Sequence, residues 1–482
     1  MRTEFQGAFR ARVIRLIEIA LGVGLSVALP AFGQTDNTPP RPPVPALVGI
    51  DNSSTPPESG ATPEVDNDRM MVPPPVSGQT YPIVLGSQEK SNYLSGGLSF
   101  TTAYTDNLEG GAASHPVSDI SYFVAPTVAL DTTTARSHLD LAYAPGFTFY
   151  QHNSGFNQAN QHAAIDFEYR LSPHITFSVR DSFEKSSNVL NQPPDFSSGT
   201  VSGGAQGPNV SVIAPVADRV SNSGNIGMAY QYALNDMVGA SGTFTNLHYP
   251  NPEQVPGLYD SSSQAGLGFY ARRLGTRQYI GVTYQYQRLL AYPAIGRNET
   301  QTHAVLGFYT ISTNRNLSIS FFGGPQYSDT LQPPTSTQSA ATTLRSWTPA
   351  GGASIGWQAH LSSFALSYGH VITSGGGLAG AVQQDTAMLS VRQQLTRTLN
   401  ASVSGGYAQN NVVGGEVLGA SSGHSLSGTA SVQQLLGPHV SVVLGYSRVH
   451  QSYTDIQAIS TFPDTNREFI SISYQFSKSL GR

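Results

Sequence analysis

A strict two-residue alternation of apolar and polar side chains ends the chain and recurs in many segments before it. In the last such segment one face is small and polar, and the other carries Ile470, Ile472, Tyr474 and Phe476. Side chains on a strand point alternately to opposite faces, so the pattern predicts a strand with one apolar face. A soluble half-buried strand looks the same, but this chain offers no separate core to cover so many apolar faces. A closed sheet with lipid outside and water inside requires such a repeat.

The composition also favours a membrane protein. Only 11% of the 482 residues are charged, against roughly 25% in an average soluble protein. The net charge of −5 and the 10% of aromatic residues do not fit a disordered chain, and the weak charge argues against nucleic acid as a partner. Cys is absent, which excludes disulfides and a lipidated Cys anchor. Past the N-terminus there is no run of about 18 apolar residues, so any membrane span must be β.

Residues 1–33 predict a secretory signal peptide. The first fifteen residues contain four arginines, and Ile19 to Leu29 is apolar. Ala31-Phe32-Gly33 then supplies the small residues that a signal peptidase requires. The alternative is an N-terminal anchor helix, which the short apolar stretch and Pro30 disfavour. We therefore expect export, with a mature chain that begins near Gln34.

Residues 34–90 predict an extended linker in the periplasm. Twelve prolines lie between Pro39 and Pro82, with Ser, Thr, Asp and Asn among them. Such a segment cannot donate ladder hydrogen bonds or bury a core. Pro42-Pro43-Val44-Pro45 offers the alternative of a docking motif, and a spacer is the favoured interpretation.

Residues 91–482 predict an antiparallel up-and-down barrel of 18 strands, or of 16 if one hairpin is miscounted. The connections alternate between short and long. The short turns are expected at Thr132–Ala135, Ser172-Pro173, Asn235-Asp236, Gly275-Thr276, Thr313-Asn314, His360-Leu361, Thr396-Arg397 and Gly437-Pro438. The Gly/Ser/Pro-rich long connections include 248–260, 291–298, 329–345, 374–380, 411–423 and 454–465. An even strand number with short turns on one side returns both ends of the barrel to the periplasm.

Charged residues within these strands are the candidate pore-lining groups. A charge on the lipid face near the midplane costs on the order of 2–4 kcal/mol for Arg or Lys, so we expect each to face the lumen. The candidates are Asp140, Asp166, Glu168, Arg170, Arg180, Arg272 and Arg392. Opposed acids and bases in a pore bias which solutes pass. Equally, charges on adjacent strands can pair with one another across the sheet and serve only the structure.

The longest connection, 187–218, would be the third extracellular loop. In diffusion porins that loop folds inward and narrows the channel. Here it is rich in Gly, Ser and Pro, so an external mobile loop and a constriction both stay open.

No catalytic or metal-binding pattern is evident. Gly352–Gly356 and Gly419–Gly423 both match Gly-x-Ser-x-Gly, with serines at Ser354 and Ser421. A nucleophile elbow needs a strand, a sharp turn and then a helix, and no helix is expected after either match. The twelve His residues show no metal-ligand spacing. We expect no enzyme activity and no cofactor.

The final strand resembles that of outer-membrane β-barrel proteins, which alternates apolar residues and ends on an aromatic, usually Phe. In that family the barrel-assembly machinery reads this strand. The resemblance therefore assigns Ile470, Ile472, Tyr474 and Phe476 as an assembly signal and implies a location in the outer membrane, in contact with its lipid. One departure is that Ser477–Arg482 follows Phe476, where most members of the family stop.

Residues 92 to about 190 resemble the β-barrel porins found beside exopolysaccharide genes. The shared features are Asp106-Asn107, Ser118-Asp119, Ala125-Pro126, Arg136, Leu139–Tyr143, Phe149-Tyr150, His162 and Tyr169-Arg170-Leu171. The resemblance implies a passive pore for polar solutes, saccharide or exopolysaccharide, and brings no catalytic residues. No plug domain precedes the barrel, which disfavours an energy-coupled receptor. The alternative is a non-conducting barrel that acts as an adhesin or scaffold through its loops. The sequence leaves assembly into a homo-oligomer open.

Overall fold

The computed structural model describes residues 92–480, apart from 109–114, 187–210, 213–217, 294–295, 315–316, 335–339, 414–421, 455 and 461. The expected signal peptide and linker lie outside the described residues. Eighteen strands form one sheet. They are β1 Asn92–Thr105, β2 Asp119–Thr133, β3 Ser137–Tyr150, β4 Gln158–Ser172, β5 Ile175–Ser186, β6 Arg219–Ala233, β7 Asp236–His248, β8 Asp260–Gly275, β9 Gln278–Tyr292, β10 Asn298–Asn314, β11 Leu317–Gln332, β12 Thr342–Gln358, β13 Ser362–Thr373, β14 Val382–Gln394, β15 Leu399–Val412, β16 Gly423–Leu435, β17 Val440–Tyr453 and β18 Asp464–Ser479.

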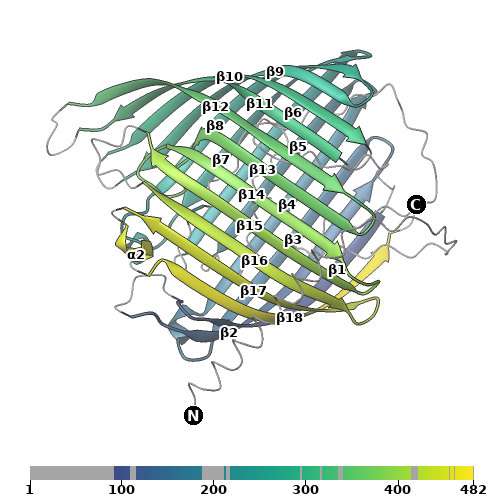
Figure 1. The fold of residues 1–482 in the computed structure, drawn as a ribbon, viewed down its shortest axis with the longest axis vertical. Helices are drawn as coiled ribbons and strands as arrows, with labels where there is room; N and C mark the ends of the chain where they lie inside the picture. The colour runs from purple at the N-terminus through teal and green to yellow at the C-terminus, as the bar shows by residue number, and fades with distance from the viewer. Residues whose placement is uncertain are drawn as a thin grey trace.

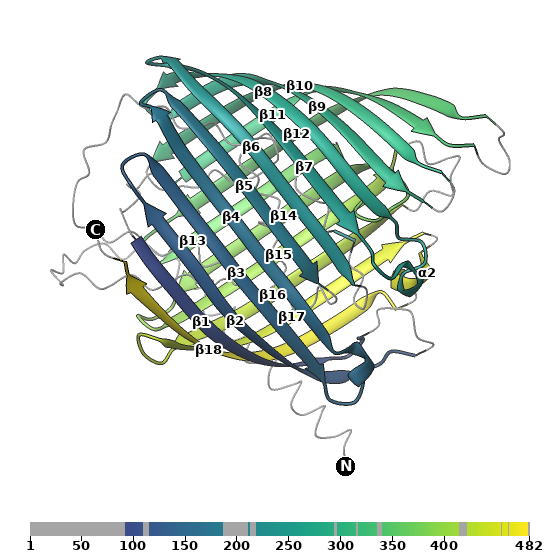
Figure 2. The same ribbon diagram turned by 180° about the vertical axis from the view of Figure 1, so that it is seen from behind.

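The sheet closes on itself. Each strand pairs antiparallel with the next, and the last strand, β18, pairs with β1 along Ile472↔Phe100 and Tyr474↔Leu98. Closure removes the free sheet edges that a bilayer would leave unsatisfied. Figures 1 and 2 show the barrel from opposite sides, with the strands of its two walls crossing in projection. The predicted 18-stranded up-and-down barrel is confirmed.

Short and long connections separate to opposite ends, as predicted. At the short-turn end the two ends of the barrel meet, where Leu480 N donates to Asn92 O over 2.9 Å. Among the described residues, the long-loop end carries three small helical elements: η1 Ser154–Phe156, η4 Pro252–Gln254 and α2 Gln457–Ser460. No helix in the described part of the chain is long and apolar enough to span a membrane.

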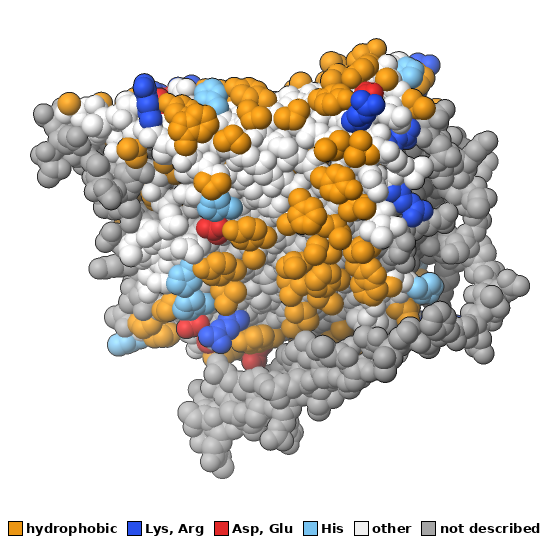
Figure 3. Space-filling view, turned by 45° about the horizontal axis from the view of Figure 1, so that its top comes forward, with side chains coloured by type: hydrophobic (Ala, Val, Ile, Leu, Met, Phe, Trp, Pro, Cys, Tyr) orange, Lys and Arg blue, Asp and Glu red, His pale blue; other side chains and the backbone are white. Residues whose placement is uncertain are grey.

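The outer face of the barrel is apolar. On β6, Ile226, Met228 and Tyr230 are about half exposed, while the alternating residues Ser223 and Asn225 are buried. The same alternation follows the other strands, so the exposed apolar residues mark the outside and their neighbours mark the inside. Figure 3 shows hydrophobic side chains spread over the visible wall, with few charges between them. The strands, at 12 to 17 residues, exceed the 9–11 that a tilted span needs. The closed barrel with this exterior is an outer-membrane barrel.

One seam of the barrel is paired over only part of its length. Strand β13 pairs with β12 from His370↔Gly351 down to Ser363↔Gln358. Above that point residues 342–350 of β12 pair with β11, and residues 371–373 of β13 pair with β14. Ile372 N instead donates to Gln326 Oε1 over 3.3 Å, and Gln326 is a buried, inward residue of β11. The tip of the β13–β14 hairpin therefore passes inside the wall that β11 and β12 form.

The interior is not polar throughout. A buried apolar cluster lines the inner side from β6 to β12 and includes Met237, Tyr279, Leu306 and Phe308. Aromatic rings in and beside this cluster occupy the space next to glycines of the adjacent strand, such as Phe308 at Gly281 and Phe322 at Gly352. Without a Cβ at these positions, large rings fit close to the wall. The polar inner face expected from the sequence is thus interrupted between β6 and β12.

Candidate functional site in the barrel interior

A row of charged residues crosses four neighbouring strands on the inner wall. Asp131 of β2 faces Asp140 of β3, which faces Asp166 of β4, which faces Arg180 of β5. Arg180 Nε lies 2.7 Å from Asp166 Oδ2. Three carboxylates at directly opposed positions repel one another, and one guanidinium in the row does not balance them. The row therefore carries more carboxylates than guanidinium groups.

Six of the seven predicted pore-lining residues lie on the inner face. Asp140, Asp166, Glu168, Arg170 and Arg180 gather on β3–β5 toward the short-turn end, and Arg170 Nε lies 3.7 Å from Glu168 Oε1. Arg392 lies alone among these candidates on β14, opposite the inward residues Ser363 and Ser402. Asp131 joins the group, although the sequence analysis did not select it. Their role in permeation stays a prediction.

Arg272 lies on the outer face, in contrast to the predicted inward position. Its cross-strand partners are Asp236 and Ile280, and Ile280 is an exposed residue of the outer wall. Arg272 Nε lies 3.9 Å from Asp236 Oδ1, with 59% of the Arg272 side chain exposed. The reason is depth in the membrane. Arg272 is three residues before Gly275, the last residue of its strand, and near a strand end the cost of a lipid-facing cation falls to about 0–1 kcal/mol.

Neutral hydrogen-bonding side chains line the rest of the polar interior. Among the buried polar residues of the described chain, all but Asp119, Arg219, Glu299 and Arg467 are Ser, Thr, Asn or Gln. Many pair across strands through hydroxyls: Thr101 with Ser471 at 2.8 Å, Thr245 with Ser263 at 2.6 Å, and Ser441 with Ser473 at 2.7 Å. A hydroxyl can both donate and accept, so this wall suits uncharged polar solutes as well as ordered water.

An apolar cluster at the long-loop end, here called the cap, joins the loops to the wall. It comprises Val212, Leu247, Tyr249, Val255, Leu258, Leu378, Val382, Tyr453, Ile456 and Ile459. Its members come from four different connections and from the strand ends beside them. Because these side chains are almost fully buried, the described parts of the loops that carry them are packed together.

The β5–β6 connection reaches the far wall. Ser211 Oγ accepts hydrogen bonds from Gln384 Nε2 at 3.2 Å and Asn410 Nδ2 at 2.9 Å, and Tyr453 Oη donates to Ser211 O at 3.4 Å. These partners lie on β14, β15 and β17, whereas the connection leads into β6. On an 18-stranded ring β6 and β15 are diametrically opposed. Ser211 and Val212 therefore lie against the wall opposite β6, near the long-loop ends of β14, β15 and β17. Residues 187–210 and 213–217 lie outside the described residues, so the choice between a constriction and an external loop stays open.

The β13–β14 connection is an inward element, and the sequence analysis did not single it out. Residues 374–378 are all buried. Tyr259 N donates to Gly377 O at 2.7 Å, Tyr249 Oη donates to Gly376 O at 3.4 Å, and Asn298 Nδ2 donates to Ala379 O. The donors belong to the β7–β8 connection and β10, on the other side of the half-paired seam. Gly376 and Gly377 have φ of 62° and 108°, so the sequence Ser374-Gly375-Gly376-Gly377 permits a turn that other residues would strain.

Tyr249 stands at the centre of the cap. It is the first residue of the β7–β8 connection and is fully buried. This burial raises the pKa of its hydroxyl to about 12. The hydroxyl is therefore neutral at ordinary pH and remains a donor to the β13–β14 connection.

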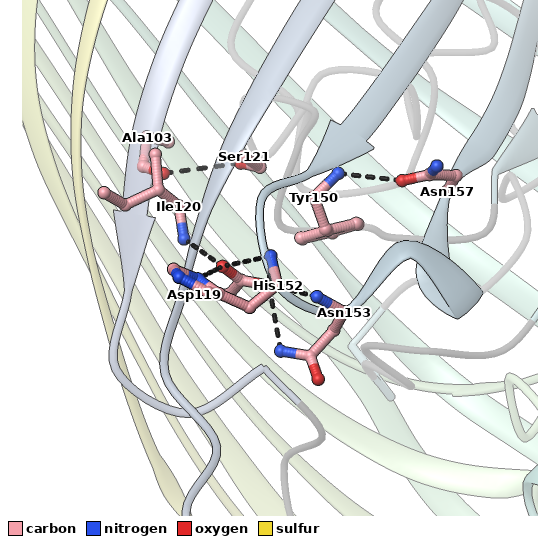
Figure 4. Close-up of polar contacts among 8 residues, drawn as sticks. All are labelled: Ala103, Asp119, Ile120, Ser121, Tyr150, His152, Asn153 and Asn157. Atoms are coloured by element: carbon pink, nitrogen blue, oxygen red, sulfur yellow. Dashed lines mark hydrogen bonds and ion pairs between the residues drawn. The ribbon is translucent and has the colours of Figure 1, made fainter.

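Residues that carry the resemblance to the exopolysaccharide-associated porins fix the rim of the barrel. The side chain of Asp119 is fully buried, and its carboxylate accepts from Ile120 N at 2.7 Å, Asn153 N at 2.9 Å and Asn153 Nδ2 at 2.9 Å. His152 Nδ1 lies 3.0 Å from Asp119 Oδ1. Figure 4 shows the loop that follows β3 gathered around this carboxylate.

Asp106 and Asn107 hold the closing seam in a similar way. Asn466 N and Asn466 Nδ2 donate to the Asp106 carboxylate at 2.8 and 2.7 Å, and Asn107 Nδ2 donates to Asp464 O at 2.9 Å. These bonds tie the end of β1 to the start of β18. Among the shared residues, Asp106, Asn107 and Asp119 thus have a structural role.

The predicted assembly residues lie together on the outside of β18. Ile470, Ile472, Tyr474 and Phe476 are each about half exposed. The ring of Phe476 covers Gly96 of β1, where an added Cβ would come within 2.7 Å of Phe476 Cε1. Their recognition by the assembly machinery stays a prediction.

The first of the two Gly-x-Ser-x-Gly motifs does not form a nucleophile elbow. Ser354 lies within β12, with strand on both sides and none of the helix that a nucleophile elbow requires. Residues 419–421 of the second match lie outside the described residues. Within the described ranges no group of three or more His, Asp or Glu side chains could hold a metal ion.

Comparisons with known proteins return folds alone. No family model matches the chain, and no curated protein matches it. Among solved structures, OpdK of Pseudomonas aeruginosa, crystallised with vanillate, is 9% identical over 80% of this chain and 99% of its own, with a TM-score of 0.39. OccAB4 of Acinetobacter baumannii is 7% identical over 81% and 99%, with a TM-score of 0.40. The unliganded ferric citrate transporter FecA is 11% identical over 76% of this chain and 60% of its own, with a TM-score of 0.39.

Proposed function

We propose that the protein is a passive channel through the outer membrane for uncharged or cationic polar solutes, with saccharides as the favoured class. The observation that carries the proposal is the inner wall of Ser, Thr, Asn and Gln side chains, interrupted by the acidic row on β2–β5. Barrels of 16–18 strands are wide enough to hold an aqueous channel. No energy input is required, because solutes would move down their gradients.

The saccharide class follows from the chemistry of the wall. Hydroxyl and amide groups exchange hydrogen bonds with sugar hydroxyls at little net cost, since both partners exchange them equally well with water. The resemblance of residues 92 to about 190 to exopolysaccharide-associated porins supports the same class of solute. It extends the class from small sugars to oligomeric or polymeric saccharides.

The cap sets the size limit in this proposal. Ser211-Val212 lies against the far wall and the β13–β14 connection enters the interior, both at the long-loop end, so a solute from outside meets them first. The acidic row lies deeper, toward the short-turn end, where it would favour cations over anions.

A liposome-swelling assay tests the proposal. Purified, refolded barrel in liposomes should admit a neutral monosaccharide faster than a neutral tetrasaccharide, and should admit an amino sugar faster than a uronic acid of the same size. Equal rates for all four sugars, matching protein-free liposomes, would contradict it.

The cap also supports a second candidate, a barrel closed to solutes that acts as an adhesin or scaffold. The supporting observation is the near-complete burial of Val212, Leu378 and Ile459, which is expected of a permanent closure. In that case swelling would stay at the background rate, and removal of the loops would abolish surface attachment of the cells.

A further inference from the structure

The short-turn end of the barrel carries a ring of cations, here called the collar. It consists of Arg136, Arg272, Arg273, Arg277, Arg397 and Lys478, in or beside four connections or strand ends around the barrel. In the described part of these turns and their flanking outer-face positions, Asp236 is the one acid, paired with Arg272. The long-loop end differs, since arginines there pair with acids, such as Arg288 with Glu299 at 2.7 Å and Arg448 with Asp464 at 2.8 Å.

The most prominent of these cations lie past the ends of the strands. Arg136, Arg277 and Arg397 are in the turns themselves and are exposed. A cation meant for lipid head groups lies on the outer wall near the strand end, as Arg272 does. Turn-tip cations project instead into the water beneath the barrel, so they suit an anionic partner in that compartment.

The chain itself contains such a partner. Residues 51–68 carry Asp51, Glu58, Glu64, Asp66 and Asp68, with no Lys or Arg among the eighteen residues. The segment is joined to the barrel through Asn92, which lies at the same end as the collar. Twenty-three residues lie between Asp68 and Asn92, and a chain of that length spans up to about 80 Å. Half the ring of strands measures about 40–60 Å, so every collar residue is within reach.

We propose that the acidic segment 51–68 docks on the collar by charge complementarity and holds the N-terminal part of the chain against the periplasmic rim. Tethering gives the segment an effective concentration in the millimolar range, so weak individual ion pairs suffice. The inner wall just above the collar carries Asp131, Asp140, Asp166 and Glu168, which repel the segment. It therefore lies across the rim and does not enter the interior.

Site-directed crosslinking tests the proposal, because the chain has no Cys of its own. Cysteines placed by Gly60→Cys and Thr276→Cys, in the chain from Gln34 reconstituted into phosphatidylcholine vesicles, would react with a short bifunctional maleimide. The collar variant is Arg136→Glu/Arg277→Glu/Arg397→Glu. The matched control is Arg345→Glu, an exposed, paired cation at the opposite end. We expect the crosslinking rate to fall roughly fivefold or more in the collar variant and in high salt, and to stay unchanged in the control.

Charge exchange separates docking from damage to the fold. Adding Glu58→Lys/Glu64→Lys/Asp66→Lys to the collar variant should restore the wild-type rate, which a misfolded barrel would not do. Vesicles that also contain phosphatidylglycerol test the alternative of a lipid partner. Two results would overturn the proposal. One is an equal crosslinking rate in the wild type and the collar variant in phosphatidylcholine vesicles. The other is a rate that depends on the collar only when phosphatidylglycerol is present.

Discussion

Gly377 lies against Tyr249 so closely that a Cβ on Gly377 would stand 2.6 Å from the Tyr249 hydroxyl oxygen. The two residues belong to connections from different parts of the barrel, β13–β14 and β7–β8, which meet in the interior. Their contact depends on a glycine for both space and backbone conformation, since φ at Gly377 is 108°.

Gly377→Ala should therefore release the β13–β14 connection from the cap. The left-handed backbone costs a non-glycine residue about 1–3 kcal/mol, and the contact with Tyr249 adds to that cost. We expect faster hydrogen exchange at residues 374–381 while the strands keep their protection. Gly275→Ala is the matched control, because a Cβ there meets no atom within 4 Å. Equal exchange in the two variants would show that the loop does not depend on this contact.

High pH should weaken the cap through Tyr249. The folded pKa of about 12 lies above the usual value of about 10, so the contribution of this residue to stability is complete below pH 10. It is lost progressively as the pH rises from about 10 through 12, because the open state ionises first. Tyr249→Phe removes this titration. Exchange in residues 374–381 should rise above pH 10 in the wild type and less so in Tyr249→Phe; parallel curves would contradict this assignment.

Neutralising the acidic row should reduce cation preference. Asp131→Asn/Asp140→Asn removes two inward carboxylates and leaves the pair of Arg180 with Asp166 intact. We expect the cation-to-anion permeability ratio, measured from reversal potentials in a salt gradient, to fall roughly twofold or more. Asp329→Asn, on the outer face and paired with Arg345, should leave the ratio unchanged. An unaltered ratio in the double variant would assign the row a structural role.

Asp119→Ala should destabilise the rim at the loop after β3. The substitution leaves the backbone amides of His152 and Asn153 without their acceptor, at a cost of about 2–3 kcal/mol. Protease nicking within 151–157 should rise well above that of His152→Ala, whose ring is 69% exposed and supplies one contact. Equal cleavage of the two variants would show that the Asp119 carboxylate does not hold the loop after β3 in place.

Tyr474→Ala/Phe476→Ala should lower the yield of assembled barrel in cells. The two side chains lie on the outer face of β18 at the seam with β1, and the resemblance to outer-membrane barrels assigns them to assembly. The fraction of folded, heat-modifiable protein in the outer membrane measures the effect, with Leu480→Ala just beyond the strand as control. An unchanged yield would show that these two side chains are not needed for assembly. The packing of Phe476 on Gly96 in the wild type would then be their only role shown by the structure.

The strands, their number and the separation of short from long connections were predictable, because lipid outside and water inside impose a two-residue period at every strand. The face of Arg272 was not, because the rule that charges point inward weakens near the strand ends. The inward position of residues 374–381 could not be predicted from the sequence either. A Gly/Ser-rich run is equally suited to an external loop, and what holds it inside is a set of distant donors, Tyr249, Tyr259 and Asn298. Nor did alternation reveal the packed corner around Phe308, where inward aromatics lie over glycines.

Single-channel recording tests the central claim most directly: that the barrel encloses a solute path narrowed by an inward β13–β14 connection. The measurement compares the wild type in a planar bilayer with a variant in which Asn-Gly replaces residues 375–380. We predict discrete conductance steps in the wild type and larger steps in the variant. If neither the wild type nor the variant gave conductance steps, although both were shown to be folded barrels, the account would be contradicted.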